Sequence, residues 1–455
     1  MRILQVTNGY PPTASAGVEI YTATISRQLA HSHAVFVFTR EGGTDLPDAS
    51  LLDEEQAGVQ IRRVVNNFQG IHHFNDFYRN AEIEAHFRNY VTAVRPDIIH
   101  FQHCIGLSIH LLAIARELGI PHLMTLHDYW FLCYRIQLLD AQGARCNGPL
   151  KGVNCRRCAW WPMAAQALHN PVFIATEALV RQLPPSLGER AARPLTDMLL
   201  RNPEGNAPML PLIERAWHMK SALLHVPQLL TPSEYVRQRY IAYGLPAERI
   251  RALPLGLDLT PWQSAAPRTP RTPNAPFRVG YIGTLYPHKG VHTLVEAVAL
   301  LPSDLIALTL YGYGDDESPY ISELQAQARQ NVTFAGRYDN RELPTMLANL
   351  DAIVIPSLWD ETFSIVAREA LLGGVPVLAS RLGALPELIS EGEFGLLFPP
   401  GDSETLASRL GALATGSMRI VPDRAQVGAQ IWSVERHVAE LERMYQQRMA
   451  GLLGQ

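Results

Sequence analysis

Short apolar runs alternate with segments of helical periodicity along most of this 455-residue chain, and no other feature restricts its fold as strongly. In the first half, runs typical of β-strands occupy residues 2–7, 34–39, 97–102, 122–126 and 228–231. Apolar residues at helical spacing begin at Val18, between the first two runs. Strands that alternate with helices form parallel, doubly wound sheets, so the chain is predicted to be an α/β protein.

A proline-rich segment at 264–276 separates this half from a second one, as is typical of a linker. Beyond it, β-type runs occupy residues 277–282, 305–311, 332–334, 352–356 and 375–379. We therefore expect two Rossmann-like domains, residues 1–262 and residues 277–430. A last helix in 431–455 is left over, and one place for it is against the N-terminal domain. Prolines break the alternation between 160 and 227, so a helical insertion is expected over about 133–227.

Composition excludes several classes of protein. The net charge of −4 gives no reason to expect a nucleic-acid partner. No apolar run reaches the roughly 18 residues that a membrane-spanning helix needs, and polar residues interrupt the N-terminus too early for a signal peptide. We expect a cytoplasmic protein, with peripheral contact at the inner face of the membrane left open.

Four successive strands of the second half are expected to end in loops suited to a phosphate-bearing ligand. Ligands of open parallel sheets bind outside the carboxyl ends of the strands, where glycines let them approach the backbone. These loops contain Gly283-Thr284, Gly312, Gly336-Arg337 and Thr362-Phe363-Ser364-Ile365. Lys289 adds a point charge for a phosphate, and the helix start after Thr362 adds unpaired N–H groups. Each signal alone is typical of an ordinary turn or surface, but together they favour a phosphate ligand.

Two glutamates eight residues apart, Glu361 and Glu369, stand in the last of these loops and in the helix that follows it. Glu369 lies about two turns into an apolar helix, where a carboxylate is costly unless it is hydrogen-bonded. Its Cα–Cβ bond tilts back toward the helix start. A surface glutamate paired with Arg368 or Arg381 explains the pattern equally well, so the two residues alone leave the question open.

The segment from Glu361 to Glu369 is similar to the E-x7-E motif of the retaining glycosyltransferases of family four, which have the two-Rossmann GT-B architecture. The match covers nearly the whole chain, and other segments similar to family patterns are 231–233, 255–258, 289–290, 356–357, 373–377 and 395–402. The resemblance implies an enzyme that transfers a sugar from a nucleotide diphosphate donor, with retention, in a cleft between its two domains.

The resemblance also implies a role for each matching residue. Glu361 would bind hydroxyls of the donor sugar and Glu369 the ribose of the nucleotide. Lys289 would bind the diphosphate, together with the backbone of residues 363–365. The family often has an arginine where this chain has Thr284, and His288 or Arg337 are candidates to replace it.

In the first half, His127 follows the β-type run at 122–126 and resembles the active-site histidine of the family, although a lone histidine is more often structural. Gly17 resembles the second glycine of the family's Gly-Gly loop near the donor phosphates, with Ala16 in the first position. The helix that begins at Val18 would help to neutralise the diphosphate with its positive end.

In the mechanism proposed for such families, no protein nucleophile is needed, because the leaving phosphate takes the acceptor's proton. The chain has no Asp-x-Asp signature, so no Mg²⁺ requirement is expected. The acceptor is left open among a polysaccharide, a lipid-linked glycan and a small molecule. A lipid carrier could meet the basic and aromatic residues Trp160, Trp161, Arg181, Arg190, Arg193 and Trp217.

Other functions fit the same fold. A sugar-nucleotide epimerase and a non-catalytic nucleotide-sugar-binding protein are the alternatives. A nicotinamide dehydrogenase is remoter, because no Gly-x-Gly-x-x-Gly follows the first strand of either domain.

Four cysteines follow the His127 segment with the spacing C-x12-C-x8-C-x2-C: Cys133, Cys146, Cys155 and Cys158. Such a set is typical of a structural, tetrahedral zinc site. Free thiols, an iron–sulfur cluster or disulfides are the alternatives. Cys104 is expected to be an ordinary buried thiol.

Overall fold

The computed structural model describes residues 1–14, 16–158, 183–184, 187, 191, 210–263, 268–272, 274–314 and 318–451. The chain divides into two compact units, Met1–Gly256 with Val434–Gln455, and Leu257–Ser433. The chain thus leaves unit 1 after Gly256 and returns to it at Val434. Most of the expected helical insertion, with Trp160, Trp161, Arg181, Arg190 and Arg193, lies outside the described residues.

Unit 1 is built on an eight-stranded sheet with the order β3-β4-β2-β1-β5-β6-β7-β8. Its strands are β1 Arg2–Thr7, β2 Ala34–Glu41, β3 Leu51–Gln56, β4 Val59–Val65, β5 Ile98–Phe101, β6 His122–Thr125, β7 Leu229–Thr231 and β8 Ile250–Ala252. All neighbours are parallel except β3 and β4, which form an antiparallel hairpin at the edge. The sequence did not predict β3, because its exposed run Leu-Leu-Asp-Glu-Glu-Gln has no apolar alternation. Charged side chains on an edge strand discourage pairing with other chains.

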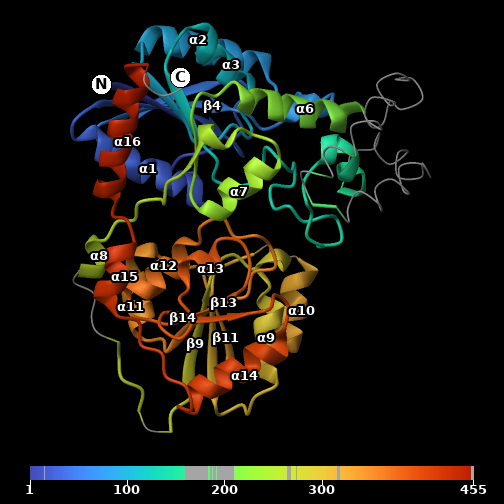
Figure 1. Ribbon diagram of the computed structural model, residues 1–455, viewed down its shortest axis with the longest axis vertical. Coiled ribbons are helices and arrows are strands. Elements are labelled where there is room, and N and C mark those ends of the chain that lie inside the picture. Colours follow the sequence, from blue (N-terminus) through green and yellow to red (C-terminus); the bar gives the residue numbers. More distant parts are fainter. Residues whose placement is uncertain are drawn as a thin grey trace. The chain divides into compact units, whose positions relative to one another are not determined.

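The helices of unit 1 are α1 Gly17–Ala30, α2 Ala81–Val94, α3 His110–Glu117, α6 Leu210–Leu224, α7 Glu234–Ala242 and α16 Val434–Met449, with short 3₁₀ segments η1 Phe74–Phe77, η2 Leu150–Cys158 and η6 Ala247–Arg249. The C-terminal helix α16 lies beside α1 (Figure 1). It buries Leu441, Met444 and Tyr445 against this unit. The last helix of the chain is therefore part of the first folding unit.

Unit 2 is built on a six-stranded, entirely parallel sheet with the order β11-β10-β9-β12-β13-β14. Its strands are β9 Phe277–Ile282, β10 Ile306–Tyr311, β11 Val332–Gly336, β12 Ala352–Ile355, β13 Val377–Ser380 and β14 Gly395–Phe398. Its helices are α8 Thr260–Gln263, α9 Val291–Ala299, α10 Pro319–Gln327, α11 Leu343–Ala348, α12 Ile365–Leu372, α13 Leu385–Leu388, α14 Ser403–Ala414 and α15 Arg424–Gln430, with the 3₁₀ segments η7 Pro287–Lys289 and η8 Asn340–Glu342.

The order of strands in unit 2 is that of a dinucleotide-binding Rossmann sheet, with the switch of direction between β9 and β12. The predicted doubly wound α/β fold is confirmed for both units. None of the helices in the described part of the chain is long and apolar enough to span a bilayer.

A buried arginine anchors the loop that precedes α1. Arg63 of β4 is only 4% exposed and forms an ion pair of 2.9 Å with the buried carboxylate of Glu41. Its guanidinium also donates to the backbone oxygens of Tyr10 (3.0 Å) and Pro11 (2.7 Å) and to the hydroxyl of Thr13 (3.0 Å). The loop that leads to Gly17 is therefore anchored from the sheet.

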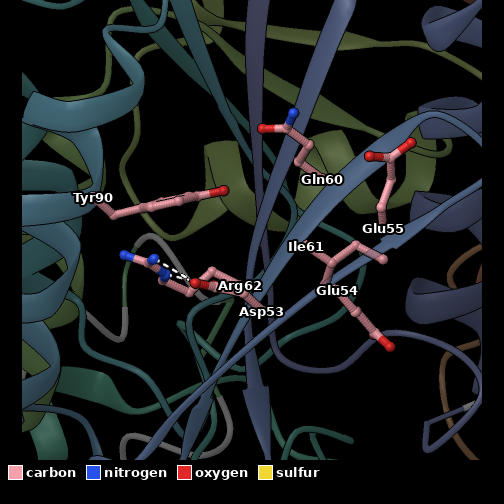
Figure 2. Close-up of a pocket in the computed structure, with 7 residues that line it drawn as sticks. All are labelled: Asp53, Glu54, Glu55, Gln60, Ile61, Arg62 and Tyr90. Atoms are coloured by element: carbon pink, nitrogen blue, oxygen red, sulfur yellow. Dashed lines mark hydrogen bonds and ion pairs between the residues drawn. The ribbon is translucent and has the colours of Figure 1, made fainter.

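The neighbouring arginine makes a different kind of contact. Arg62 points to the other face of β4, where it forms two hydrogen bonds with Asp53 and lies over the ring of Tyr90 (Figure 2). The side chain of Asp53 is 60% exposed, so water screens this pair.

These two arginines give a matched test of buried and exposed ion pairs. We expect Arg63→Leu to lower the free energy of unfolding by about 3–5 kcal/mol, because Glu41 is left buried without a cation and keeps the hydrogen bond from the Thr13 hydroxyl. Arg62→Leu should cost less than about 1 kcal/mol. Urea unfolding followed by far-UV circular dichroism measures both, and equal losses would show that the Arg63 pair has no special importance.

Candidate active site

The strand-end loops of unit 2 lie side by side, as the sequence predicted. The N–H of Gly283, after β9, donates to Tyr311 O (3.0 Å), and the N–H of Gly312, after β10, donates to Gly336 O (2.7 Å). A Cβ at Gly312 would lie 1.8 Å from Gly283 O, so only glycine allows these loops to approach so closely. Thr284 accepts a hydrogen bond from the Tyr281 hydroxyl at its backbone oxygen (2.6 Å).

Lys289 and Glu361 form the central contact of the unit 2 site. The ammonium of Lys289, at the end of η7, donates to Glu361 Oε1 over 2.8 Å. The same oxygen accepts from the Ser357 hydroxyl (2.6 Å) and the Trp359 indole N–H (2.8 Å). Glu361 is only 7% exposed. Burial alone would raise the pKa of this carboxyl, but Lys289 and the hydrogen bonds outweigh it and hold the pKa below its usual value, so Glu361 is an anion.

The two candidates for a second phosphate ligand differ in charge. Burial, and then the charge of Lys289, lower the pKa of His288 to about 4, so this imidazole is neutral near pH 7. Arg337 is exposed after β11, with its guanidinium over the ring of Tyr313. Of the two, only Arg337 supplies a positive charge.

The helix α12 begins at this site. Ser364 precedes it in the left-handed conformation (φ 59°), and Phe363 before it is buried. The buried side chain of Arg368 donates to the backbone oxygens of Phe363 and Ser364 and thereby holds their peptide groups in place. Thr362, Phe363, Ser364 and Ile365 thus form a fixed helix start, whose first N–H groups have no partner within the helix.

Glu369 lies one to two turns further along α12, with a partly buried carboxyl group. Burial raises its pKa to about 7, and no other cause contributes. Burial and, to a smaller extent, the charge of Glu369 raise the pKa of the nearby Tyr338 hydroxyl to about 12. A carboxyl group that is desolvated but unpaired by a cation is typical of a ligand site.

In unit 1, His127 directly follows β6 and is 6% exposed. Its Nε2 lies 2.8 Å from Gln102 Oε1. Burial, and then the charge of His103, lower the pKa of His127 to about 3, so the ring is neutral. The neighbouring Asp128 contacts His103 Nε2 (3.1 Å) and accepts from Trp130 N (2.8 Å), which explains it as a structural residue of the loop.

Gly17 is the first residue of α1 and is exposed. A Cβ added to it would meet nothing within 4 Å, so the packing of unit 1 does not require glycine here and the space above it is open. Beneath the loop, Asn8 donates to Glu19 Oε1 over 2.6 Å.

The structure gives no support to the zinc prediction. None of the five cysteines, all of which lie in the described part of the chain, forms a disulfide. Among the described residues, no group of three or more His, Cys, Asp and Glu side chains is placed so that it could hold a metal ion. The Cys146 sulfur accepts a hydrogen bond from Asn154 Nδ2 (3.1 Å), and burial raises the pKa of Cys158 to about 11 and that of Cys155 well above its usual value. Burial therefore favours neutral thiols here.

A separate surface pocket lies on the β3–β4 hairpin of unit 1, lined by Asp53, Glu54, Glu55, Gln60, Ile61, Arg62 and Tyr90 (Figure 2). Its one cation, Arg62, is already paired with Asp53. The remaining carboxylates would repel a phosphate, so this pocket does not compete with the strand-end site of unit 2.

Sequence reasoning missed the roles of Ser357, Trp359 and Gly383. Ser357 was part of a matched segment, but nothing in the sequence says that it contacts Glu361. At Gly383 (φ 59°) a Cβ would lie 2.2 Å from Glu361 O, so glycine lets the loop after β13 support the Glu361 backbone. Only a strand-end glycine signal could have found it.

Comparison with known proteins identifies the class of this site. Residues 15–176 match a family described as Glycosyltransferase Family 4, and residues 276–415 match one described as Glycosyl transferases group 1. The protein is a glycosyltransferase. The first match lies within unit 1 and the second within unit 2, so each unit matches a glycosyltransferase family over part of its length.

The glycosyltransferase has relatives with defined names. It is similar to the glycogen synthase of Mycobacterium tuberculosis, with 27% identity over 429 residues, which cover 90% of this chain and 84% of that protein. It is also similar to the MMP α-(1→4)-mannosyltransferase of Mycolicibacterium hassiacum, with 30% identity over 254 residues, which cover 53% of this chain and 60% of that one.

Solved structures show the same fold. The sucrose-phosphate synthase of Thermosynechococcus elongatus superposes with a TM-score of 0.63 at 19% identity, covering 99% of both chains. Anabaena HepE, solved in complex with UDP and glucose, has a TM-score of 0.58 at 18% identity and covers 98% of this chain and 99% of that one. The predicted GT-B architecture of the glycosyltransferase is thereby confirmed.

The raised pKa of Glu369 predicts a pH-dependent stability. Because the pKa of the folded state (about 7) exceeds the usual 4.5, stability is fully present below pH 4.5 and is lost as the pH rises through about 7. Glu369→Gln cannot ionise, so it should be more stable than the parent by roughly 2 kcal/mol near pH 9 and equal to it near pH 4. Thermal unfolding at both pH values measures this.

The control is Glu323→Gln, which neutralises an exposed glutamate of α10 in the same unit. A stabilisation of Glu369→Gln that is the same at both pH values, or is shared by the control, would contradict a desolvated Glu369.

Proposed function

We propose that this glycosyltransferase transfers a sugar from a nucleotide diphosphate donor to a hydroxyl of an acceptor, with retention and without a metal ion at the catalytic step. The observation that carries the proposal is the ion pair between the half-buried Lys289 and the buried Glu361 at the strand ends of unit 2. The ammonium group of Lys289 lies 2.8 Å from the ionised, hydrogen-bonded carboxylate of Glu361. The ammonium group suits the diphosphate of a sugar nucleotide, and the carboxylate suits the hydroxyl groups of its sugar.

Lys289 binds the diphosphate in this proposal. Its side chain is 23% exposed, so it can contact a ligand without leaving the site. Glu361 is fixed by hydrogen bonds from Ser357 and Trp359. When a phosphate takes over the ammonium group, Glu361 keeps two hydrogen-bond donors and can accept from the sugar hydroxyls. In the absence of a donor, Lys289 and Glu361 thus neutralise each other's charge.

The backbone at the start of α12 supplies the rest of the anion site. The N–H groups of Phe363, Ser364 and Ile365 and the positive end of the helix favour a phosphate. At Gly336 an added Cβ would meet nothing within 4 Å, so the backbone there is open to a ligand, and Gly312 lets the loops after β9 and β10 approach each other. Arg337 takes the place of the second cation that Thr284 does not provide.

Glu369 binds the ribose in this proposal. Its carboxyl group, desolvated and unpaired, gains hydrogen bonds when two ribose hydroxyls donate to it. Those bonds favour the ionised form, so donor binding should lower the pKa of Glu369 from about 7.

For unit 1, the proposal assigns roles to His127 and Gly17 on the resemblance to the family. The neutral His127 ring hydrogen-bonds the donor sugar instead of donating a proton, since its pKa of about 3 leaves it uncharged. The bond from the anomeric carbon to the leaving phosphate oxygen breaks while the acceptor oxygen bonds on the same face. The acceptor's proton passes to that phosphate oxygen, and the enzyme positions the groups and stabilises the charges.

The acceptor is proposed to be a glycan hydroxyl, because the named relatives include a glycogen synthase and mannosyltransferases. Of the residues considered for a lipid carrier, Trp217 alone lies among the described ones, at 63% exposure, so membrane contact is not part of the proposal. Zinc is not part of it either.

The deciding experiment incubates the enzyme with UDP-, GDP- and ADP-sugars and a set of glycan acceptors, and follows nucleotide release and the anomeric signal of the product by NMR. We expect release that depends on the acceptor and a product with the anomeric configuration of the donor. Release without acceptor would indicate the epimerase alternative, tight donor binding without turnover would indicate a binding protein, and inversion would refute the mechanism.

Lys289 offers the sharpest test of the site. Lys289→Met should lower kcat/KM by roughly 100-fold or more, because the leaving diphosphate loses its cation. Since this change leaves Glu361 buried without its partner, the double variant Lys289→Met/Glu361→Gln serves to separate folding from function. It should unfold like the parent and remain inactive.

Arg341→Ala is the matched control for Lys289, because Arg341 is 90% exposed in the same unit and pairs with Asp339 on the surface. It should leave kcat/KM within about twofold of the parent, as expected for a screened surface charge. An active double variant would contradict the role of Lys289.

Metal independence is tested with a chelator. If Lys289, Arg337 and the start of α12 neutralise the diphosphate, dialysis against EDTA should leave kcat unchanged, and added Mg²⁺ should not raise it. A loss of turnover that Mg²⁺ restores would show that these groups are insufficient.

A further inference from the structure

We propose that a directed chain of hydrogen bonds from the C-terminal helix α16 sets which ring nitrogen of His127 carries the proton, so that Gln102, Gln5 and Tyr445 are positioning residues for His127. The functional consequence rests on the proposed role of His127 at the donor sugar. The chain lies entirely within unit 1.

The first part of the chain crosses three adjacent strands. His127 after β6 contacts Gln102 after β5 (Nε2 to Oε1, 2.8 Å), and Gln102 donates to Gln5 of β1 (Nε2 to Oε1, 2.9 Å). Both glutamines have no exposed surface. A buried amide is costly unless its donors and acceptors are used, so the orientation of each glutamine is tied to that of the next.

The second part leads to α16 and back to the sheet. Gln5 Nε2 lies 3.4 Å from the Tyr445 hydroxyl, and this hydroxyl lies 2.7 Å from Nδ1 of His100 in β5. Nε2 of His100 in turn lies 2.8 Å from the Thr125 hydroxyl of β6. Tyr445, His100 and Thr125 are also buried.

The single proton of Tyr445 gives the chain its direction. A phenol hydroxyl donates best over about 2.7–2.8 Å, which is its distance to His100 and not its distance to Gln5. Tyr445 therefore donates to His100 and accepts from the amide of Gln5. The oxygen of Gln5 then faces Gln102, and the oxygen of Gln102 faces His127. In the reverse direction, Tyr445 would have to donate its hydrogen bond to Gln5, whose amide group lies 3.4 Å away.

The end of the chain fixes His127 with its proton on Nε2. Its Nδ1 then carries a lone pair and has no hydrogen-bond partner among the described residues, so it can accept from a hydroxyl of a ligand. The ring also packs against Tyr21 in a T-shaped contact with centroids 5.0 Å apart, and the Tyr21 hydroxyl contacts His437 of α16 (2.6 Å). Helix α16 thus supports both the tautomer and the orientation of His127.

The experiment records the imidazole ¹⁵N signals of His127 in the full-length enzyme, assigned with a His127→Gln variant. The parent should show a protonated Nε2 and an unprotonated Nδ1. Tyr445→Phe removes the proton that directs the chain, so signals of both tautomers should appear, and kcat should fall roughly tenfold, as for other residues that orient a site group.

Three further variants separate a loss of the hydrogen-bond chain from a general disturbance of the fold. Gln102→Glu retains only acceptors and should keep the parent tautomer, whereas Gln102→Met offers no acceptor and should lose it. Tyr21→Phe removes a buried hydroxyl of α1 that contacts His437 of α16 but is not part of the hydrogen-bond chain. This variant should keep the tautomer. An unchanged His127 spectrum in both Tyr445→Phe and Gln102→Met would overturn the inference.

The outcomes separate this inference from the proposed function. If the tautomer changes in Gln102→Met and Tyr445→Phe but kcat does not, the chain exists and the proposed role of His127 fails. If the tautomer is constant while kcat falls, His127 has its role but is not set by the chain.

Discussion

The carboxylate of Glu361 is almost completely removed from water, and the unit 2 site depends on the contacts that make this tolerable. An isolated buried carboxylate would take up a proton. Lys289, Ser357 and Trp359 prevent this by donating to one and the same oxygen, 2.6–2.8 Å away. Because these donors come from the loops after β9 and β12, the charge also holds two strand ends of the sheet together.

Burial also determines the charge of other ionisable groups in the two units. His127 and His288 are kept neutral, while Glu369 takes up a proton near neutral pH. Lys289 and the exposed Arg337 therefore carry the positive charge at the strand ends of unit 2, and the start of α12 adds its partial charge. In the proposed function, a diphosphate would contact these cations and N–H groups, and the two flanking acids would accept hydrogen bonds from hydroxyl groups.

The fold was largely predictable because the alternation of apolar runs and helical spacing is strong in both halves. The sequence did not predict β4, β8 and β14, and it did not predict β3, whose exposed acidic residues are explained only by its place at the sheet edge. The strand-end glycines were predictable as a class, since parallel strands end at one edge. Gly383 was not, because its need for glycine comes from the Glu361 backbone in the loop after the neighbouring strand β12, and the sequence does not show how closely these two loops approach. The cysteine spacing predicted zinc, but among the described residues no group of side chains is placed so that it could hold a metal ion.

The sequence by itself determined the α/β class, the two Rossmann-like units, the loops that hold the candidate site, and the resemblance carried by Glu361 and Glu369. Only the tertiary structure decided the charge of each group, because a pKa depends on burial and on neighbours from other strands. It also decided that α16, the last helix of the chain, belongs to the first unit, and that Tyr445 is linked to His127 through two glutamines. Such contacts join residues hundreds of positions apart, and local patterns in a sequence carry no record of them.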